Sequence, residues 1–321
     1  MPEIRTLRDC ERGALLELLD GWELRDGWRG RDFFRRYLDD DPTFDPRNVW
    51  VAVECGELVA CAQAFPRRLR TALGDQEVAG VGTVFTRSDR RRRGVASAVL
   101  RATATDLERR DFAFALLFAE RVRWYGELGW RPWCDQGIRL APPASAPRRS
   151  GAEIHAMEPS RDLDDVAALH ALYSGSLVGT VVRDPELWQA SLRCAGNPDE
   201  TFLVARQEGR LLAYLRAIVL DGETTLTEWG AAAGQEEQVV ALVHRIAVGL
   251  RSAASLHLPR IVDAALADAL VRAGYSLHAE RRLTAMLRLL AVRGSDAASP
   301  DLVLDRFVPR RRFSFWLSDR F

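Results

Sequence analysis

The sequence predicts two α/β domains in tandem, each built on a mixed sheet. Apolar segments of strand length alternate with amphipathic helical segments along the 321 residues. In each half, one long helical segment joins two strands, as in a parallel crossover connection. The segment ELGWRPWCD at 127–135 is mirrored by RAGYSLHAE at 272–280, and aligning Gly129 with Gly274 gives an offset of 145 residues. The second half therefore repeats the first.

The same order of elements is expected in both halves: a strand, two helices, a hairpin, a third strand, a long helix, a strand, a short helix and a closing strand. In the first half we expect strands at 3–7, 48–54, 57–70, 77–86, 112–119 and 130–140, with helices at 9–22, 31–38, 93–110 and 121–128. In the second half we expect strands at 153–157, 201–220 (a hairpin), 223–230, near 256 and 273–290, with helices at 162–173, 185–194, 236–251 and 262–273.

Composition divides the chain further and excludes several classes of protein. We expect a first domain at 1–140, a linker rich in Pro, Ala and Ser at 141–152, a second domain at 153–291 and a tail at 292–321. Acidic and basic residues balance at 45 each, so no overall positive field favours a nucleic acid or an anionic membrane as partner.

Cysteine usage and the N-terminus indicate the compartment. The five cysteines are odd in number and scattered, which indicates reduced thiols and no metal site. The N-terminus lacks the cationic and apolar pattern of a secretory signal, and no apolar run reaches the ~18 residues that span a bilayer. We therefore expect a soluble cytoplasmic protein, with a homo-oligomer as one open option.

Like charges are crowded between the third strand and the long helix of the first half. Arg87 and four consecutive arginines, Arg90 to Arg93, stand directly before Gly94 and the helical pattern. Neighbouring guanidinium groups repel one another, so an anion nearby would relieve the repulsion. A helix start offers unpaired backbone N–H groups and a partial positive charge, and a glycine lets a ligand approach the main chain. This segment therefore predicts a pyrophosphate site, although a solvated arginine face is the simpler reading.

At this point the sequence resembles the GCN5-related N-acetyltransferase (GNAT) superfamily. The segment 91–96 fits the family's Arg/Gln-x-x-Gly-x-Gly/Ala signature, whose loop holds the pyrophosphate of acetyl-CoA, and WYGELGW at 124–130 is similar to the family's closing tyrosine segment. The cofactor-binding residues that the resemblance implies are Val84, Phe85, Thr86, Arg91, Arg92, Arg93, Gly94, Val95 and Ala96.

The resemblance also implies a mechanism. In this family the fourth and fifth strands splay apart, and the pantetheine arm of acetyl-CoA lies against the main chain of the fourth strand. A neutral amine then attacks the thioester directly, and Tyr125 matches the residue that protonates the leaving sulfur. A packed tyrosine with a solvated hydroxyl is the alternative for Tyr125. Several members carry an asparagine early in the following helix, whereas this chain has Glu120-Arg121-Val122-Arg123 there.

The second copy has lost these features. The offset places Glu236 opposite Arg91, Val239 opposite Gly94 and Leu270 opposite Tyr125. Two adjacent glutamates, Glu236 and Glu237, would repel a pyrophosphate. We expect this half to be a structural partner that shapes the acceptor cleft or an oligomer contact. All five histidines lie in it without metal-ligand spacing, so we expect surface or hydrogen-bonded core histidines.

The tandem arrangement, with an active first copy and a degenerate second copy, resembles that of the enhanced intracellular survival group of acetyltransferases. Many members of that group acetylate aminoglycosides. That group adds a third, sterol-carrier-like domain, for which too few residues follow Leu290 here. Mycothiol synthase is also a tandem relative, but its catalytic copy is the second one.

The amine acceptor is expected opposite the cofactor, against the first two helices. The substrate-binding candidates there are five aromatic residues and one acidic residue: Trp22, Trp28, Phe33, Phe34, Tyr37 and Asp40. Asp39, Asp41 and Asp45 add acidic charge that could attract a cation. A helix with an aromatic core face and an acidic solvated end explains the pattern equally well.

The tail is too apolar to remain in water, so we expect it to dock on the domains. In the enhanced intracellular survival group the C-terminal carboxylate reaches the active site and helps to take the proton from the amine. The resemblance therefore implies the same role for the carboxylate of Phe321, with Asp319 as a second candidate. A tail that only caps the core between the domains is the alternative.

These observations predict an acetyl-CoA-dependent N-acetyltransferase (EC 2.3.1 class) that acts on a primary amine of a small molecule without a metal. Two alternatives remain open: a non-catalytic acyl-CoA sensor and a malonyl-CoA decarboxylating relative. The sequence names neither the amine nor the preferred acyl chain. It contains no lysine. Codon bias and avoidance of self-acylation are two alternative explanations, and the sequence does not separate them.

Overall fold

The computed structural model describes residues 2–24, 29–143, 151–194, 200–220, 223–249, 256–290 and 299–319. Its strands are β1 (Glu3–Thr6), β2 (Val49–Glu54), β3 (Glu57–Leu69), β4 (Gln76–Thr86), β5 (Phe114–Ala119), β6 (Arg131–Ala141), β7 (Glu153–Ala156), β8 (Thr201–Gln207), β9 (Arg210–Leu220), β10 (Glu223–Ala231), β11 (Leu256–Leu258) and β12 (Ser276–Leu289). Its α-helices are α1 (Arg12–Asp20), α2 (Gly30–Asp39), α3 (Val95–Arg109), α4 (Val122–Gly126), α5 (Pro159–Gly175), α6 (Pro185–Cys194), α7 (Glu236–Gly249), α8 (Ala264–Arg272) and α9 (Pro300–Phe307). The predicted class, two α/β domains in tandem, is confirmed.

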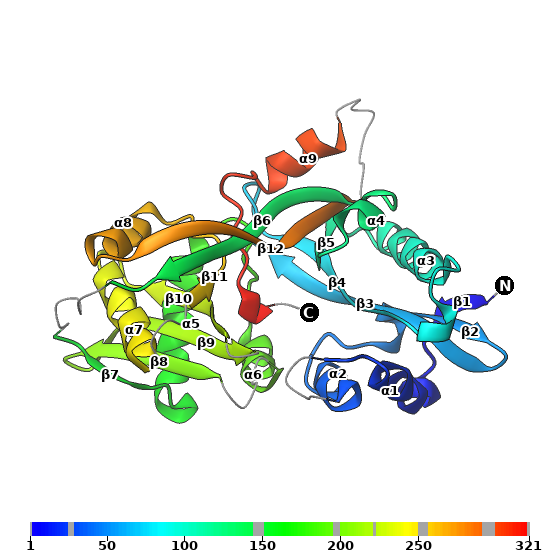
Figure 1. The fold of residues 1–321 in the computed structure, drawn as a ribbon, viewed down its shortest axis with the longest axis horizontal. Coiled ribbons are helices and arrows are strands. Elements are labelled where there is room, and N and C mark those ends of the chain that lie inside the picture. Colours follow the sequence, from blue (N-terminus) through cyan, green and yellow to red (C-terminus); the bar gives the residue numbers. More distant parts are fainter. Residues whose placement is uncertain are drawn as a thin grey trace.

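The strands form one continuous sheet in the order β1-β2-β3-β4-β5-β12-β6-β11-β10-β9-β8-β7 (Figure 1). The halves meet at β6 and β12, which lie side by side at the centre. The end of β12, Thr284–Leu289, pairs antiparallel with β5 of the first half, and the end of β6, Ile138–Leu140, pairs antiparallel with β11 of the second. Each half is thus a seven-stranded mixed sheet that the other half completes.

Length makes this exchange feasible. Strand β6 has 11 residues and β12 has 14, so at about 3.3 Å per residue each strand extends across both halves. The sequence predicts 130–140 as the closing strand of the first half. Instead, β12 separates β6 from β5, because the two long strands pair with each other along most of their lengths.

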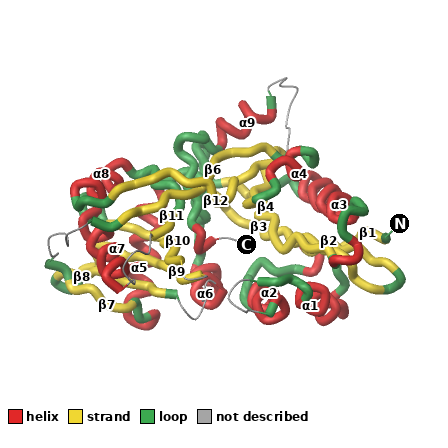
Figure 2. The backbone as a smooth tube through the Cα atoms, in the orientation of Figure 1, coloured by secondary structure: helices red, strands yellow, loops and turns green. Residues whose placement is uncertain are grey.

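Helices cover both faces of the first sheet (Figure 2). The residues of its strands alternate between two cores. Val49 and Val51 of β2 pack with α1 and α2, whereas Ala52 of the same strand packs with α3. This period of two is the one that the strand pattern predicts. The sheet is therefore buried on both sides, and only its loops and splayed edges remain for a ligand.

The C-terminal segment docks between the two halves. Leu304, Val308, Phe313 and Phe315 lie in a common core with residues of β5 and β12, and Figure 1 shows this red segment descending from α9 into the centre of the molecule. Its closest approach is at Gly179, whose φ is +103°; a Cβ there would lie 2.6 Å from the carbonyl oxygen of Ser314. Only glycine fits that contact. The sequence did not predict α9 within the tail.

Candidate functional site

Strands β4 and β5 separate early. Their parallel pairing consists of Ala79 with Ala115 and Gly80 with Leu116. Beyond these pairs, β4 continues to Thr86 and is paired with β3 on its other side. A bulge marks this stretch, with Thr83 at a φ of +49°. The main chain at the end of β4 is therefore open toward β5, as the resemblance implied.

The three cofactor candidates on this stretch face different surroundings. Val84 packs partly buried against the core below α3, whereas Phe85 is buried in the core below α1 and α2. The hydroxyl of Thr86 is buried and has no hydrogen-bond partner among the described residues. A ligand that lies along the end of β4 would therefore meet main chain and one unsatisfied hydroxyl.

The predicted pyrophosphate loop connects β4 to α3 through one 3-10 turn at Ser88–Arg90. Arg92 and Gly94 have left-handed backbones, with φ of +62° and +78°. Within the described part of the chain, the backbone N–H groups from Arg92 to Ser97 donate to no protein acceptor. A Cβ on Gly94 would have nothing within 4 Å. The loop is thus an open set of donors at a helix start, which suits a phosphate.

The arginines before this helix divide into paired and unpaired side chains. Arg87 forms ion pairs with Glu57 and Asp89, and Arg90 with Glu54 and Asp89. Arg91 donates to the carbonyl of Thr86 at 3.1 Å. Arg92 and Arg93 are exposed and form no ion pair with the described residues. The repulsion that the sequence suggested is therefore relieved for two arginines by acids, and two guanidinium groups remain for an anion.

Tyr125 lies on α4, close to the same loop. Its ring packs edge-on against Trp124 at 4.6 Å and Trp130 at 6.3 Å between centroids. Burial raises the pKa of the Tyr125 hydroxyl to about 12, and this hydroxyl forms no hydrogen bond with the described residues. It is therefore a protonated group that is free to donate.

Trp124 fixes α4 relative to α3. Its indole N–H donates to the hydroxyl of Ser97, in the first turn of α3, at 3.3 Å. The role of Trp124 was not predicted from the sequence. The sequence signal for this role was an aromatic residue directly before the candidate acid. In a helix of only five residues, side-chain contacts are needed to fix the position of the helix.

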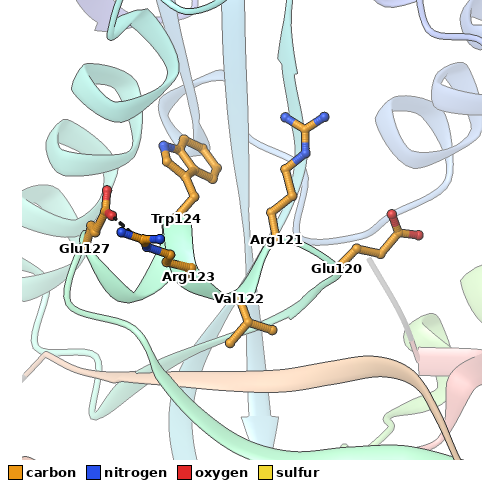
Figure 3. Close-up of a pocket in the computed structure, with 6 residues that line it drawn as sticks. All are labelled: Glu120, Arg121, Val122, Arg123, Trp124 and Glu127. Atoms are coloured by element: carbon orange, nitrogen blue, oxygen red, sulfur yellow. Dashed lines mark ion pairs between the residues drawn. The ribbon is translucent and has the colours of Figure 1, made fainter.

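The segment that departs from the family pattern lines a shallow pocket of about 430 Å³. Its residues are Glu120, Arg121, Val122, Arg123, Trp124 and Glu127. Figure 3 shows Arg123 beside Glu127, 3.7 Å apart, whereas the carboxylate of Glu120 points away from this pair. Arg121 contributes a positive charge that opposes the rise in the Tyr125 pKa. The pocket is next to Tyr125 in the chain and is mixed in charge.

The aromatic acceptor candidates form a cluster on α1, α2 and the loop between them. Trp22 stacks on Phe85 at 5.5 Å and lies 5.0 Å from Phe34. Phe34 is buried in the core, whereas Phe33 and Tyr37 are partly exposed. Trp28 lies outside the described residues. Since Phe85 is also a cofactor candidate, Trp22 connects the predicted acceptor region to the end of β4.

The acidic residues of the same region are neutralised. The pairs are Asp39 with Arg12, Asp40 with Arg193, Asp41 with Arg67 and Asp45 with Arg47. Arg193 belongs to α6, so the 2.9 Å pair with Asp40 joins the two domains. These pairs favour the structural reading of the acids, and they leave the aromatic side chains as the stronger candidates for acceptor contacts.

The tail ends in a buried ion network. Asp319 accepts from Arg183 at 2.7 Å, and Arg183 also donates to the fully buried Glu228 at 2.6 Å. Arg183 therefore holds the pKa of Glu228 well below its usual range. Phe321, whose carboxylate is the candidate base, lies outside the described residues. Because Asp319 already has a partner in Arg183, it is a poor candidate for a free base.

Residues 12–133 match a family described as an acetyltransferase (GNAT) domain. The first domain is a GNAT acetyltransferase domain. A search of curated proteins found no match. Among the described residues, no helix is long and apolar enough to cross a membrane, and no cluster of three or more His, Cys, Asp or Glu side chains suits a metal ion.

Solved structures resemble this chain over 90–91% of its length. A GCN5-related N-acetyltransferase from Anabaena variabilis has a TM-score of 0.72 at 12% identity, over 91% of this chain and 74% of that one. Eis1 from Mycobacterium abscessus has a TM-score of 0.61 at 21% identity, over 91% and 74%. N-myristoyltransferase from Saccharomyces cerevisiae, solved with bound myristoyl-CoA, has 0.60 at 11% identity, over 90% and 79%. These likenesses show the tandem GNAT-like fold.

Proposed function

We propose that this GNAT protein is an N-acyltransferase that moves an acetyl group from acetyl-CoA to a primary amine of a small molecule. The observation that carries the proposal is the row of unpaired N–H groups from Arg92 to Ser97, beside the unpaired Arg92 and Arg93. This row begins at the end of an open strand edge. A pyrophosphate in the loop and an extended pantetheine along Val84–Thr86 match these features.

In the proposed reaction a neutral amine attacks the thioester carbon in a ternary complex. The new N–C bond forms while the C–S bond breaks, and the amine loses one proton to water or to a base. Main-chain N–H groups at the end of β4 stabilise the developing oxyanion. Tyr125 donates its proton to the leaving thiolate and regains one from solvent, which its unpaired, protonated hydroxyl supports. The Phe321 carboxylate as base stays a prediction.

The acceptor is proposed to lie against the partly exposed aromatic side chains of the first two helices. Trp22, Phe33 and Tyr37 are partly buried at the edge of this cluster, and Trp22 touches Phe85 on β4. Aromatic side chains offer apolar contact area and, for a protonated amine before it loses its proton, cation–π attraction. The acids of the region are paired with arginines, so they contribute less to attraction of the amine.

One experiment separates the proposal from its two alternatives. Calorimetry measures acetyl-CoA binding, and a thiol assay measures CoA release with aminoglycosides, polyamines, amino acids and peptide N-termini. The proposal predicts binding and amine-dependent release of thiol. Binding without release for any amine would favour a sensor, and carbon dioxide release from malonyl-CoA without an amine would favour the decarboxylating alternative. Absence of binding for both acetyl-CoA and malonyl-CoA would overturn all three.

A further inference from the structure

The second domain contains a pocket of about 860 Å³ that the proposed reaction does not use. It lies between α5, the turn before β9, the end of β10, the start of α7 and the tail segment after α9. Its volume falls within the range of small-molecule pockets. The floor is apolar, with Leu169, Leu177, Leu211 and Ala231 buried around it.

The pocket occupies the place that corresponds to the cofactor loop of the first domain. Strand β10 pairs with β11 in parallel at Thr224 and Thr225, as β4 pairs with β5, and the pocket lies where β10 passes into α7. In the second domain this connection is short: Gln235 donates to the carbonyl of Ala232 at 2.9 Å, and Glu236 begins the helix. A diphosphate therefore has no cradle here.

Arginines from other segments surround this pocket instead. Arg210 stands at the start of β9, and Arg311 and Arg312 belong to the tail. All three are exposed, and their side chains form no ion pair with the described residues. Arg260 donates to the carbonyls of Arg310 and Arg311 at 2.9 and 3.1 Å, so the tail turn is held in place beside the pocket.

One of the three lining carboxylates is neutralised by a cation: Asp165 pairs with Arg206 at 2.7 Å. Asp263 accepts from the hydroxyl of Tyr173 at 2.8 Å and from the N-terminal N–H groups of α8. Asp263 and Glu236 form no ion pair with the described residues. Three unpaired guanidinium groups against these two carboxylates leave the rim net positive.

We propose that this pocket binds a small amphiphile with a single anionic head group, a carboxylate or a phosphate. The apolar floor would take the hydrocarbon body, and Arg210, Arg311 and Arg312 would take the head group by charge-assisted hydrogen bonds. Glu236, at the start of α7 and in the lining, opposes a second phosphate, so the ligand is not a diphosphate such as CoA. This site is independent of acyl transfer in the first domain.

The test is calorimetry on the full chain saturated with CoA, so that the first domain is occupied. The probes are dodecanoate, dodecyl phosphate and dodecyltrimethylammonium, all below their micelle-forming concentrations. The proposal predicts binding of one or both anions at one site per chain and at least about tenfold weaker binding of the cation. The ratio of the two anions then tells whether the head group is a carboxylate or a phosphate.

Three variants locate the site. The triple variant Arg210→Gln, Arg311→Gln, Arg312→Gln should weaken anion binding by about tenfold or more. Ala168→Trp, at an exposed position of α5 in the lining, should block the pocket while the helix surface tolerates it. Arg245→Gln is the matched control, because Arg245 is an exposed arginine on α7 outside the lining.

Several results would overturn the proposal. They are absence of binding for both anions, equal binding of the cation, or unchanged anion binding in either pocket variant. A second equivalent of CoA in the second domain would also overturn it, because the site would then accept a nucleotide. Weakened binding in Arg245→Gln equal to that in the triple variant would show nonspecific attraction to arginine.

Discussion

The same turn of the fold is built in opposite ways in the two domains. In the first domain a loop of two left-handed residues, Arg92 and Gly94, leads into α3 and leaves its backbone donors open. In the second domain Gly234, with a φ of +73°, lies in a tighter turn that is followed by two glutamates. One connection in a shared topology is therefore open in the first copy and closed in the second, and the proposed pyrophosphate site depends on this difference.

The two domains also differ in the charged groups that they bury. The first domain buries the pair of Asp41 with Arg67, whereas the second domain buries a network in which Arg183 joins Glu228 to Asp319. Glu228 of β10 contacts His170 of α5 at 3.1 Å, and it accepts from Tyr214 of β9 at 2.9 Å. Burial lowers the pKa of His170, which favours its neutral form. The second copy thus contains an internal charged network, and Arg183 of this network anchors the tail through Asp319.

The largest effect is expected from breaking this network. Arg183→Gln removes the cation that faces both Glu228 and Asp319, so the buried Asp319 loses its ion pair and Glu228 keeps only the longer pair with Arg216, at 3.5 Å, as a contact with an arginine. The free energy of unfolding, measured by chemical denaturation, should fall by about 3–5 kcal/mol.

Arg193→Gln is the matched control for Arg183→Gln. It breaks the half-exposed pair with Asp40 between the domains, and it should cost no more than about 1 kcal/mol. Equal losses for the two variants would contradict a scaffold role for the buried network.

A smaller effect is expected from the candidate acid. Tyr125→Phe should lower kcat by about 100-fold with little change in acetyl-CoA affinity, because the proton is transferred only in the transition state. Tyr275→Phe is the control in the second domain, where burial also raises the tyrosine pKa to about 12, and kcat should not change. An unchanged kcat in Tyr125→Phe, where chemistry limits the rate, would remove Tyr125 from the mechanism.

The pH profile sharpens the same prediction. A general acid must be protonated, and a pKa raised to about 12 keeps the Tyr125 hydroxyl protonated at all lower pH values. The kcat of the wild-type protein should therefore show no decline from Tyr125 ionisation below about pH 11. A falling limb near pH 10 that disappears in Tyr125→Phe would mean that the hydroxyl is not buried as described.

The smallest effect is expected from the glycines of the two turns. Gly94→Val should weaken acetyl-CoA binding by at least about tenfold, because a side chain would occupy the space above the open donors and strain the left-handed backbone. Gly234→Val carries the same backbone cost, since a Cβ there would also have nothing within 4 Å. If both variants bound acetyl-CoA equally well, the assignment of the loop would fail.

Local features of the site were predictable from the sequence. The arginine run, Gly94 and the start of α3 could be located because a helix start and a glycine at positive φ have local sequence signals. The strand pattern of β4 and the tyrosine of α4 were likewise readable. The pairing of Asp40 with Arg193 was not predictable, because it joins residues far apart in the chain whose proximity depends on the docking of two domains.

The order of the elements, the repeat and the candidate anion-binding segment could be read from the sequence, since each depends on periodicity or on a few neighbouring residues. The completion of the first sheet by β12 and of the second by β6 depends on tertiary contacts. Tertiary contacts also set which arginines stay free, and they place tail arginines beside a second pocket. Strand partners and ion pairs depend on which distant segments of the chain meet in space, and local sequence patterns do not specify those meetings.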